Sequence, residues 1–242
     1  VETLSMAKIR NANPKSSSGG YTRVFNDENL GKLIQKIQST VISNGTELEK
    51  YISEKSNLIA NLDDFLSNRK DEQCNGAFLC TKAVIKKSKY KLDKHEPDLI
   101  VFEINSSEKN CYIIELKDGD NFDTKKSDGE FENLEKYKNH LGSKIPFVTN
   151  FFICCFNQES KDLIVKGFKN RFNVEQVMTG KQLCNLLGID YDTIIETRKK
   201  DAEDNVDYFT DQLIKIPLIN SKIFSIKNSH IEENDFYNND EM

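Results

Sequence analysis

Two carboxylates and a lysine stand at the ends of two neighbouring apolar runs between residues 96 and 117. Asp98 precedes the first run, and Glu115 and Lys117 close the second. Carboxylate oxygens are the hard ligands that Mg²⁺ prefers, and a lysine ammonium can neutralise charge that develops on a phosphate. Brought to one point, these groups could hold a divalent cation, activate a water and hydrolyse a phosphodiester bond.

The two apolar runs, Leu99–Ile104 and Cys111–Leu116, predict the strands of a β-hairpin. Both are rich in Ile, Val, Phe and Tyr, and a polar turn separates them. The side-chain period of two in a strand places Glu115 and Lys117 on the same face. Pairing of the strands can bring Asp98 beside them, although the six turn residues leave the register open.

These residues predict a metal site with distinct roles. Asp98 and Glu115 would be the carboxylate ligands, the Leu116 carbonyl a backbone ligand, and Lys117 the group that positions the nucleophile or neutralises the phosphate. Taken alone, a Pro-Asp pair or a Glu-x-Lys triplet is more often structural. Their combination at strand ends favours the functional interpretation, because a carboxylate such as Glu115 is costly to bury without a partner or a metal.

The pattern Pro97-Asp98, then sixteen residues, then Glu115-Leu116-Lys117 resembles the signature of the PD-(D/E)XK nuclease superfamily, in particular its type II restriction endonucleases. The resemblance implies an α/β fold with a central mixed sheet flanked by helices, at about residues 95–190. It also implies Mg²⁺-dependent hydrolysis of double-stranded DNA at a specific short sequence, often by a homodimer. Asp98 and Glu115 fall on the metal ligands of that signature, and Lys117 falls on its catalytic lysine.

Several alternatives stay open at this point. A structure-specific repair nuclease or resolvase, or a non-catalytic DNA-binding domain of the same fold, would carry a similar pattern. His95 could line the site, although an exposed loop position is favoured. Many superfamily members add an acidic residue from a preceding helix, and the sequence does not choose among Glu47, Glu49, Glu54, Asp63 and Asp64.

The chain before the motif predicts a helical N-terminal part. Apolar residues at helical spacing indicate a helix over residues 30–41. A second helix is expected after a break at Asn44-Gly45, because Thr46 and Glu49 form a capping-box pattern. Residues 1–23, rich in Ser, Gly and Asn, predict a flexible arm.

The chain after the motif predicts alternating helices and strands, which favours an α/β fold with partly parallel pairing. We expect first a helix with a Ser127/Glu130 capping box, a central strand at Phe147–Phe156, a helix at 158–170 and a strand at Val174–Met178. After these we expect a helix capped by Thr179 and Gln182, a helix from Tyr191 to Pro217, and two short edge strands in LIKIPLI and KIFSIK. A single nuclease domain over residues 24–230 and a mobile acidic tail over 231–242 are expected.

Charge is segregated along a chain whose formal net charge is −5. A DNA-binding protein is usually expected to show a basic footprint, and six lysines between residues 82 and 94 supply one beside the motif. Lys15 in the arm and Lys125 and Lys126 before a helix are further candidates for phosphate contacts. Solvated surface positions are the alternative for all three.

Composition excludes several other classes of protein. The six cysteines form no CxxC pair and favour buried free thiols in a reducing cytoplasm. No apolar run approaches the length of a membrane span, and the N-terminus lacks a signal-peptide pattern. We therefore expect no membrane partner. No Walker-type glycine loop is present, which argues against a nuclease coupled to its own motor.

Overall fold

The computed structural model describes the chain except for residues 1–6, 15–18, 68–74, 121 and 240–242, and it describes residues 229–239 by their backbone alone. The chain divides into two compact units. Residues 45–194 form an α/β unit, and residues 1–44 together with 195–242 form a helical unit. Two long helices, α2 (Glu28–Lys55) and α8 (Tyr191–Ile214), each contribute to both units.

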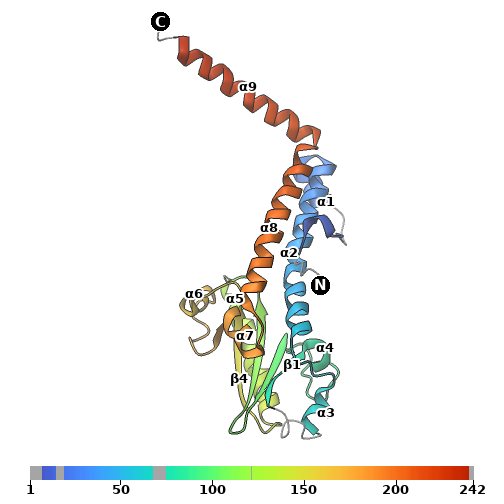
Figure 1. The fold of residues 1–242 in the computed structure, drawn as a ribbon, viewed down its shortest axis with the longest axis vertical. Coiled ribbons are helices and arrows are strands. Elements are labelled where there is room, and N and C mark those ends of the chain that lie inside the picture. The colour runs from blue at the N-terminus through green and yellow to red at the C-terminus, as the bar shows by residue number, and fades with distance from the viewer. Residues whose placement is uncertain (1–6, 15–18, 68–74, 121, 240–242) are drawn as a thin grey trace. The chain divides into compact units, whose positions relative to one another are not determined.

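A five-stranded mixed sheet forms the centre of the α/β unit (Figure 1). The strands follow the order of the sequence across the sheet: β1 (Gly76–Thr81), β2 (Leu99–Ile104), β3 (Lys109–Lys117), β4 (Val148–Cys155) and β5 (Val177–Thr179). The first three strands pair antiparallel, and β3, β4 and β5 pair parallel. The apolar run of β4 suits its place inside the parallel part, where both faces of a sheet are covered.

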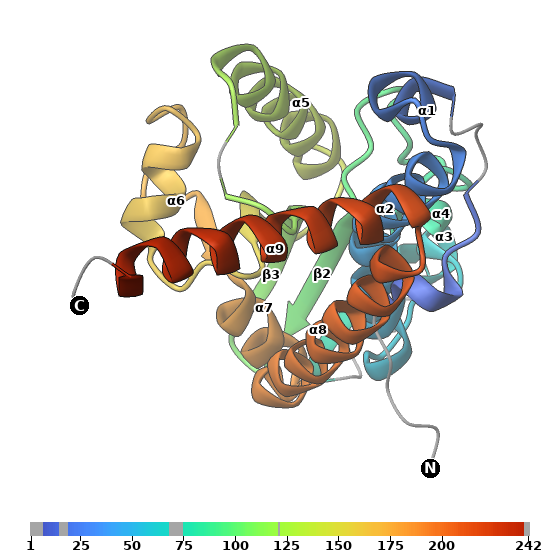
Figure 2. The same ribbon diagram turned by 90° about the horizontal axis from the view of Figure 1, so that it is seen from above.

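Helices cover both faces of this sheet, and Figure 2 shows α5 and α7 on opposite sides of it. The helices that lie wholly in the α/β unit are α3 (Leu62–Ser67), α4 (Lys82–Ile85), α5 (Thr124–Gly142), α6 (Lys161–Gly167) and α7 (Gly180–Leu187). Tyr137 and Leu141 of α5 are buried against Phe102 and Ile113 of the sheet. The expected α/β architecture, a mixed sheet flanked by helices, is confirmed.

Helix α7 packs closely on the end of β4. Thr179 caps it through the predicted capping box, in which the Thr179 hydroxyl accepts from the Gln182 N–H and the Gln182 side chain accepts from the Thr179 N–H. A Cβ at Gly180 would lie 2.2 Å from the carbonyl oxygen of Phe156. Only glycine therefore allows the first turn of α7 to approach the sheet this closely.

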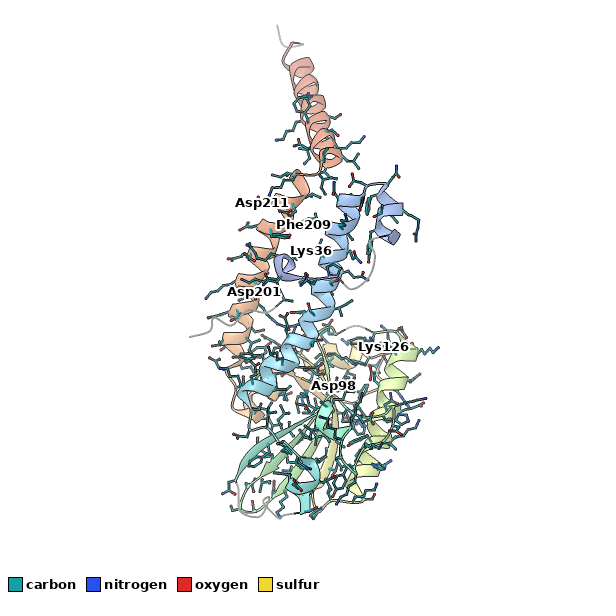
Figure 3. The ribbon with its side chains drawn as sticks, turned by 90° about the vertical axis from the view of Figure 1, so that its right-hand side faces the viewer. Lys36, Asp98, Lys126, Asp201, Phe209 and Asp211 are labelled. Atoms are coloured by element: carbon teal, nitrogen blue, oxygen red, sulfur yellow. The ribbon has the colours of Figure 1, made fainter. Side chains whose placement is uncertain are left out.

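The helical unit is held by the first part of α2 and the later part of α8, which run side by side (Figures 1 and 3). Leu30 and Leu33 of α2 pack against Ile216, and Phe209 joins this small core. A short 3₁₀ helix (Ile9–Asn11), α1 (Gly19–Phe25) and α9 (Pro217–Asn239) complete the unit.

Residues 7–11, within the expected flexible arm, are fastened to α8. The Ile9 N–H donates to the Asn205 side chain at 2.7 Å, and that side chain donates to the Ala7 carbonyl at 3.0 Å. Arg10 donates to Asp204 at 2.9 Å. The expected tail is helical in α9 as far as Asn239, and its last residues lie outside the described ones. The expected domain boundaries stay a prediction.

The sequence was misleading about helix boundaries at two places. Helix α2 runs through Asn44-Gly45 without the expected break. A mid-helix glycine costs only about 1 kcal/mol, which the buried faces on either side, such as Leu33 and Leu48, can offset. The position nevertheless coincides with the boundary between the two units. Helix α5 is capped by Asp123, which accepts from the Lys126 N–H at 2.8 Å, so the expected capping box at Ser127 is wrong.

Three further predictions about elements need correction. The two short edge strands expected near Pro217 are instead turns of α8 and α9. Short apolar runs fit a helix as well as a strand, and proline favours the first helical position, which Pro217 occupies in α9. The helix expected at 158–170 spans only Lys161–Gly167, and the next strand is Val177–Thr179. Strand β1 was not predicted at all.

The described residues bear on two expectations from composition, one about cysteines and one about membrane spans. The five described cysteines are free and buried, as expected, and Cys74 lies outside this part of the chain. Among the described helices, none is long and apolar enough to cross a lipid bilayer.

Candidate active site

The β2–β3 hairpin brings Asp98 to the end of β3. Leu99 pairs with Ile114, so continuing this register sets Asp98 opposite Glu115. The Leu116 N–H donates to the Oδ2 atom of Asp98 at 3.1 Å, which fixes the carboxylate beside the strand. The turn contains four residues rather than the expected six, because β3 already begins at Lys109. Figure 3 labels Asp98 at this end of the sheet.

A second lysine holds the other oxygen of the same carboxylate. Lys82, the first residue of α4, follows β1 directly. Its Nζ lies 2.9 Å from Oδ1 of Asp98, and its backbone N–H donates to the Asp98 carbonyl, also at 2.9 Å. The Asp98 side chain is 13% exposed and the Lys82 side chain 40% exposed. Asp98 is therefore largely enclosed between β1 and β3.

Lys117 is enclosed between two carboxylates. Its Nζ lies 2.7 Å from Glu115 on the same strand and 2.8 Å from Glu130, which extends from α5. All three side chains are at most 17% exposed. The predicted placement of Glu115 and Lys117 on one face of β3 is confirmed, and Glu130 adds a partner from the helix that covers this face.

The pKa values of these groups reflect burial and charge together. Burial, and after it the charge of Asp98, raise the pKa of Glu115 to about 7, while Lys117 opposes the change. For Lys117, burial disfavours the charged form, but Glu115 and Glu130 outweigh burial and hold the pKa above its usual range. The pKa of Lys82 is also raised, since Asp98 outweighs the effect of burial. Both lysines are thus cationic at neutral pH.

One of the five candidate acids on the preceding segment belongs to this electrostatic cluster. The pKa of Glu49, on α2, is raised by burial and then by the charge of Asp98, and it is lowered by Lys82 and Lys117. Three of the other four are engaged elsewhere or exposed: Glu54 lies near Lys50 (3.6 Å), Asp63 accepts from the Lys89 N–H (3.1 Å), and Asp64 is exposed. The structure therefore favours Glu49.

The donor set fits a Mg²⁺ ion. Among the described residues no three His, Cys, Asp or Glu side chains lie close enough together to form a ready-made metal cage. Mg²⁺ does not need one, because it usually takes one or two carboxylates and keeps waters for the remaining positions. Burial and the neighbouring charge of Asp98 both disfavour the ionised form of Glu115, and a bound divalent cation would favour it.

Comparison with known proteins shows the family to which the chain belongs. No protein-family model matches the chain. The chain is 47% identical over 224 residues to the type II restriction enzyme HhaII of Haemophilus parahaemolyticus, an alignment that covers 90% of this chain and 98% of that enzyme. The chain belongs to the type II restriction enzymes. It is accordingly a site-specific deoxyribonuclease, as the sequence pattern predicted.

The structure describes some of the remaining predicted positions of this restriction enzyme. Lys125 and Lys126 are exposed in the first turn of α5, where Figure 3 labels Lys126. The ammonium of Lys126 lies over the Phe122 ring, 4.7 Å from its centroid. Lys15 lies outside the described residues. The Leu116 N–H points to Asp98, and its carbonyl points to the same side of the strand.

His95 does not have the exposed loop position that was favoured. Its Nδ1 atom lies 2.6 Å from the Asn133 side-chain oxygen on α5, and the residue is partly buried. The contact ties the segment before Asp98 to the helix that carries Glu130. The structure thus gives the imidazole a bracing contact on α5.

Sequence reasoning missed two residues of the restriction enzyme's charged cluster. Lys82 was recognised only as part of a lysine-rich stretch, since the strand before it was not predicted. Glu130 was assigned to a capping box, and that pattern masked its contact with Lys117. A signal for Lys82 was available in the run GAFLCT, a short apolar segment that ends directly before the lysine.

Proposed function

We propose that Asp98, Glu115 and Lys117 form a PD-(D/E)XK active site that hydrolyses double-stranded DNA with Mg²⁺ as cofactor. The observation that carries the proposal is the convergence at one strand end of two carboxylates and an ammonium, with Lys117 2.7 Å from Glu115 and Asp98 bonded to the Leu116 N–H. Burying charged groups is costly, and groups with perturbed pKa values that gather at one place are typical of functional sites.

The residues would divide the work as follows. Asp98, Glu115 and the Leu116 carbonyl would hold Mg²⁺, and Glu49 would add a carboxylate from α2. When bound, Mg²⁺ polarises the scissile phosphate and lowers the pKa of a bound water. Lys117 stays protonated because its pKa is raised. It therefore acts as a fixed positive charge that orients the nucleophile and stabilises the phosphate, rather than as a general base.

Glu130 sets the position of that positive charge. A lysine side chain has four rotatable bonds, and a single carboxylate partner would leave the ammonium free to turn. Contacts of 2.7 Å and 2.8 Å from two different elements restrict it to one place. Such pre-positioning lowers the cost of aligning the reacting groups.

Binding of DNA is proposed to use basic residues of both units. Lys125 and Lys126 would contact backbone phosphates from the start of α5, and Lys15 would contribute from the N-terminal segment. A homodimer is proposed because a symmetric pair of sites suits a palindromic recognition sequence. The buried free thiols suit a reducing compartment, and we propose a cytoplasmic location.

Digestion of a plasmid of known sequence with Mg²⁺, followed by mapping of the ends, tests this proposal. Defined fragments that disappear with a chelator are expected, whereas smearing would indicate a processing nuclease. Asp98→Asn, Glu115→Gln and Lys117→Met should each slow cleavage by at least about a hundredfold. Full activity in Asp98→Asn or Glu115→Gln would contradict the assignment.

A matched pair of variants on α2 tests the additional acid. Glu49→Gln is expected to reduce the cleavage rate at limiting Mg²⁺ by about tenfold or more. Glu54→Gln, one turn further along the same helix and exposed, should cleave like the wild type. Equal effects in the two variants would exclude Glu49 from the site.

A further inference from the structure

Lys82 is bonded twice to one residue. Its backbone N–H donates to the Asp98 carbonyl, and its ammonium donates to Oδ1 of Asp98, both at 2.9 Å. The other carboxylate oxygen, Oδ2, already accepts the Leu116 N–H. The ammonium thus occupies the oxygen of Asp98 that the backbone leaves open.

A divalent cation and this ammonium compete for the same atom. Mg²⁺ binds carboxylate oxygens at about 2.1 Å, so a cation on Oδ1 would stand at most about 5 Å from an ammonium held 2.9 Å from that oxygen. Like charges at such a separation repel strongly in a site shielded from water. Cation binding and the present Lys82–Asp98 contact therefore oppose one another.

We propose that Lys82 is a displaceable counter-ion of Asp98, which holds the carboxylate in the metal-free enzyme and leaves Oδ1 when a divalent cation binds. The inference rests on the proposed function, since it takes Asp98 as a metal ligand. It adds a residue that controls the strength of cation binding without being a ligand.

The two lysines of the site differ in their freedom to move. Lys117 is 17% exposed and is held by two carboxylates from different elements. Lys82 is 40% exposed, and its ammonium has Asp98 as its carboxylate partner. Since the Lys82 backbone is bonded to the Asp98 carbonyl independently of the side chain, the ammonium can swing away without disturbing β1 or α4. The Lys82 ammonium can therefore leave its carboxylate partner, whereas the Lys117 ammonium is held in place.

Calorimetric titration of the full-length protein with CaCl₂ and with MgCl₂, without DNA, tests the inference. Lys82→Gln and Lys82→Met, which remove the competing charge, are expected to bind both cations about tenfold more tightly than the wild type. Lys86→Gln is the matched control, because Lys86 is exposed near the end of the same helix, and wild-type affinity is expected for it.

Lys82→Arg separates competition from a general effect of charge. Arginine keeps the positive charge but can grip a carboxylate with two donors, so competition predicts cation binding on the order of threefold weaker than in the wild type. An effect of net charge alone predicts wild-type affinity for this variant. Should Lys82→Met fail to fold, the Gln and Arg variants still decide the outcome.

Thermal melting supplies a second measurement. Metal-free Lys82→Gln should melt at a lower temperature than the metal-free wild type, and saturating Ca²⁺ should remove the difference. Unchanged or weaker cation binding in Lys82→Gln would overturn the inference. Asp98→Asn identifies a deeper failure: if it binds cations as tightly as the wild type, Asp98 is not a ligand and the proposed metal site itself is wrong.

Discussion

In the proposed metal site, the raised pKa of Glu115 should make cation binding depend on pH. With a pKa of about 7 in the metal-free enzyme, Glu115 is about 90% ionised at pH 8 and about 10% ionised at pH 6. A cation requires the ionised carboxylate, so a proton must leave whenever the protonated form binds. The dissociation constant for Ca²⁺ should therefore rise about tenfold when the pH falls from 8 to 6.

Proton release gives an independent measure of the same event. Binding of one cation should release about 0.9 protons at pH 6 and about 0.1 at pH 8. Titration in two buffers of different ionisation enthalpy measures these numbers, because the heat of buffer protonation scales with the protons released. Ca²⁺ is the suitable probe, and DNA is left out so that the site is titrated alone.

Glu115→Gln is the decisive control for this prediction. The amide cannot titrate, so the variant should bind Ca²⁺ more weakly than the wild type at pH 8 and should lose most of the difference between pH 8 and pH 6. Histidines elsewhere in the chain remain in the variant and would preserve the pH dependence if they caused it. Equal wild-type affinity at the two pH values, or an unchanged tenfold difference in Glu115→Gln, would refute the reasoning.

Two further predictions concern the position of Lys117 and the packing of α7 on the sheet. Glu130→Gln weakens one of the two contacts that fix Lys117, so single-turnover cleavage should slow about tenfold. Ca²⁺-dependent DNA binding, measured by gel shift, should stay unchanged. Weakened DNA binding would contradict a purely positioning role. Gly180→Ala should lower the free energy of unfolding, measured by urea denaturation, by about 2 kcal/mol or more, since its Cβ would lie 2.2 Å from the Phe156 carbonyl oxygen. Gly129→Ala is the control: its Cβ would meet open space on α5, so this variant should be more stable by about 0.5–1 kcal/mol.

The core of the site could be predicted because its information is local. Two apolar runs separated by a polar turn specify a hairpin, and the period of two then fixes the face of Glu115 and Lys117 without knowledge of the rest of the chain. The capping box at Thr179 is local in the same way, and it is present in the structure. The α/β class followed from the alternation of such segments.

The supports of the site could not be predicted, because they come from distant elements. Lys82 meets Asp98 only because β1 pairs with β2, and β1 is a short edge strand with glycine and alanine in its sequence. Glu130 meets Lys117 only because α5 returns across the sheet. Glu49 was one of five equivalent acids until the packing of α2 set it near Asp98. Long-range pairing of this kind leaves no periodic signal in the sequence.

The balance of charge at the site explains why an acidic protein can act on an acidic polymer. When all four carboxylates are ionised, Asp98, Glu115, Glu130 and Glu49 carry four negative charges, and Lys82 and Lys117 carry two positive ones. The remaining charge of minus two equals that of one divalent cation with opposite sign. In the proposed site a bound cation would therefore convert a cluster that repels phosphate into a neutral one, and the Lys82 ammonium, once released from Asp98, would be available to contact a phosphate. On this reasoning cation entry and phosphate binding strengthen each other, so productive DNA binding depends on local charge at the strand ends rather than on the net charge of −5.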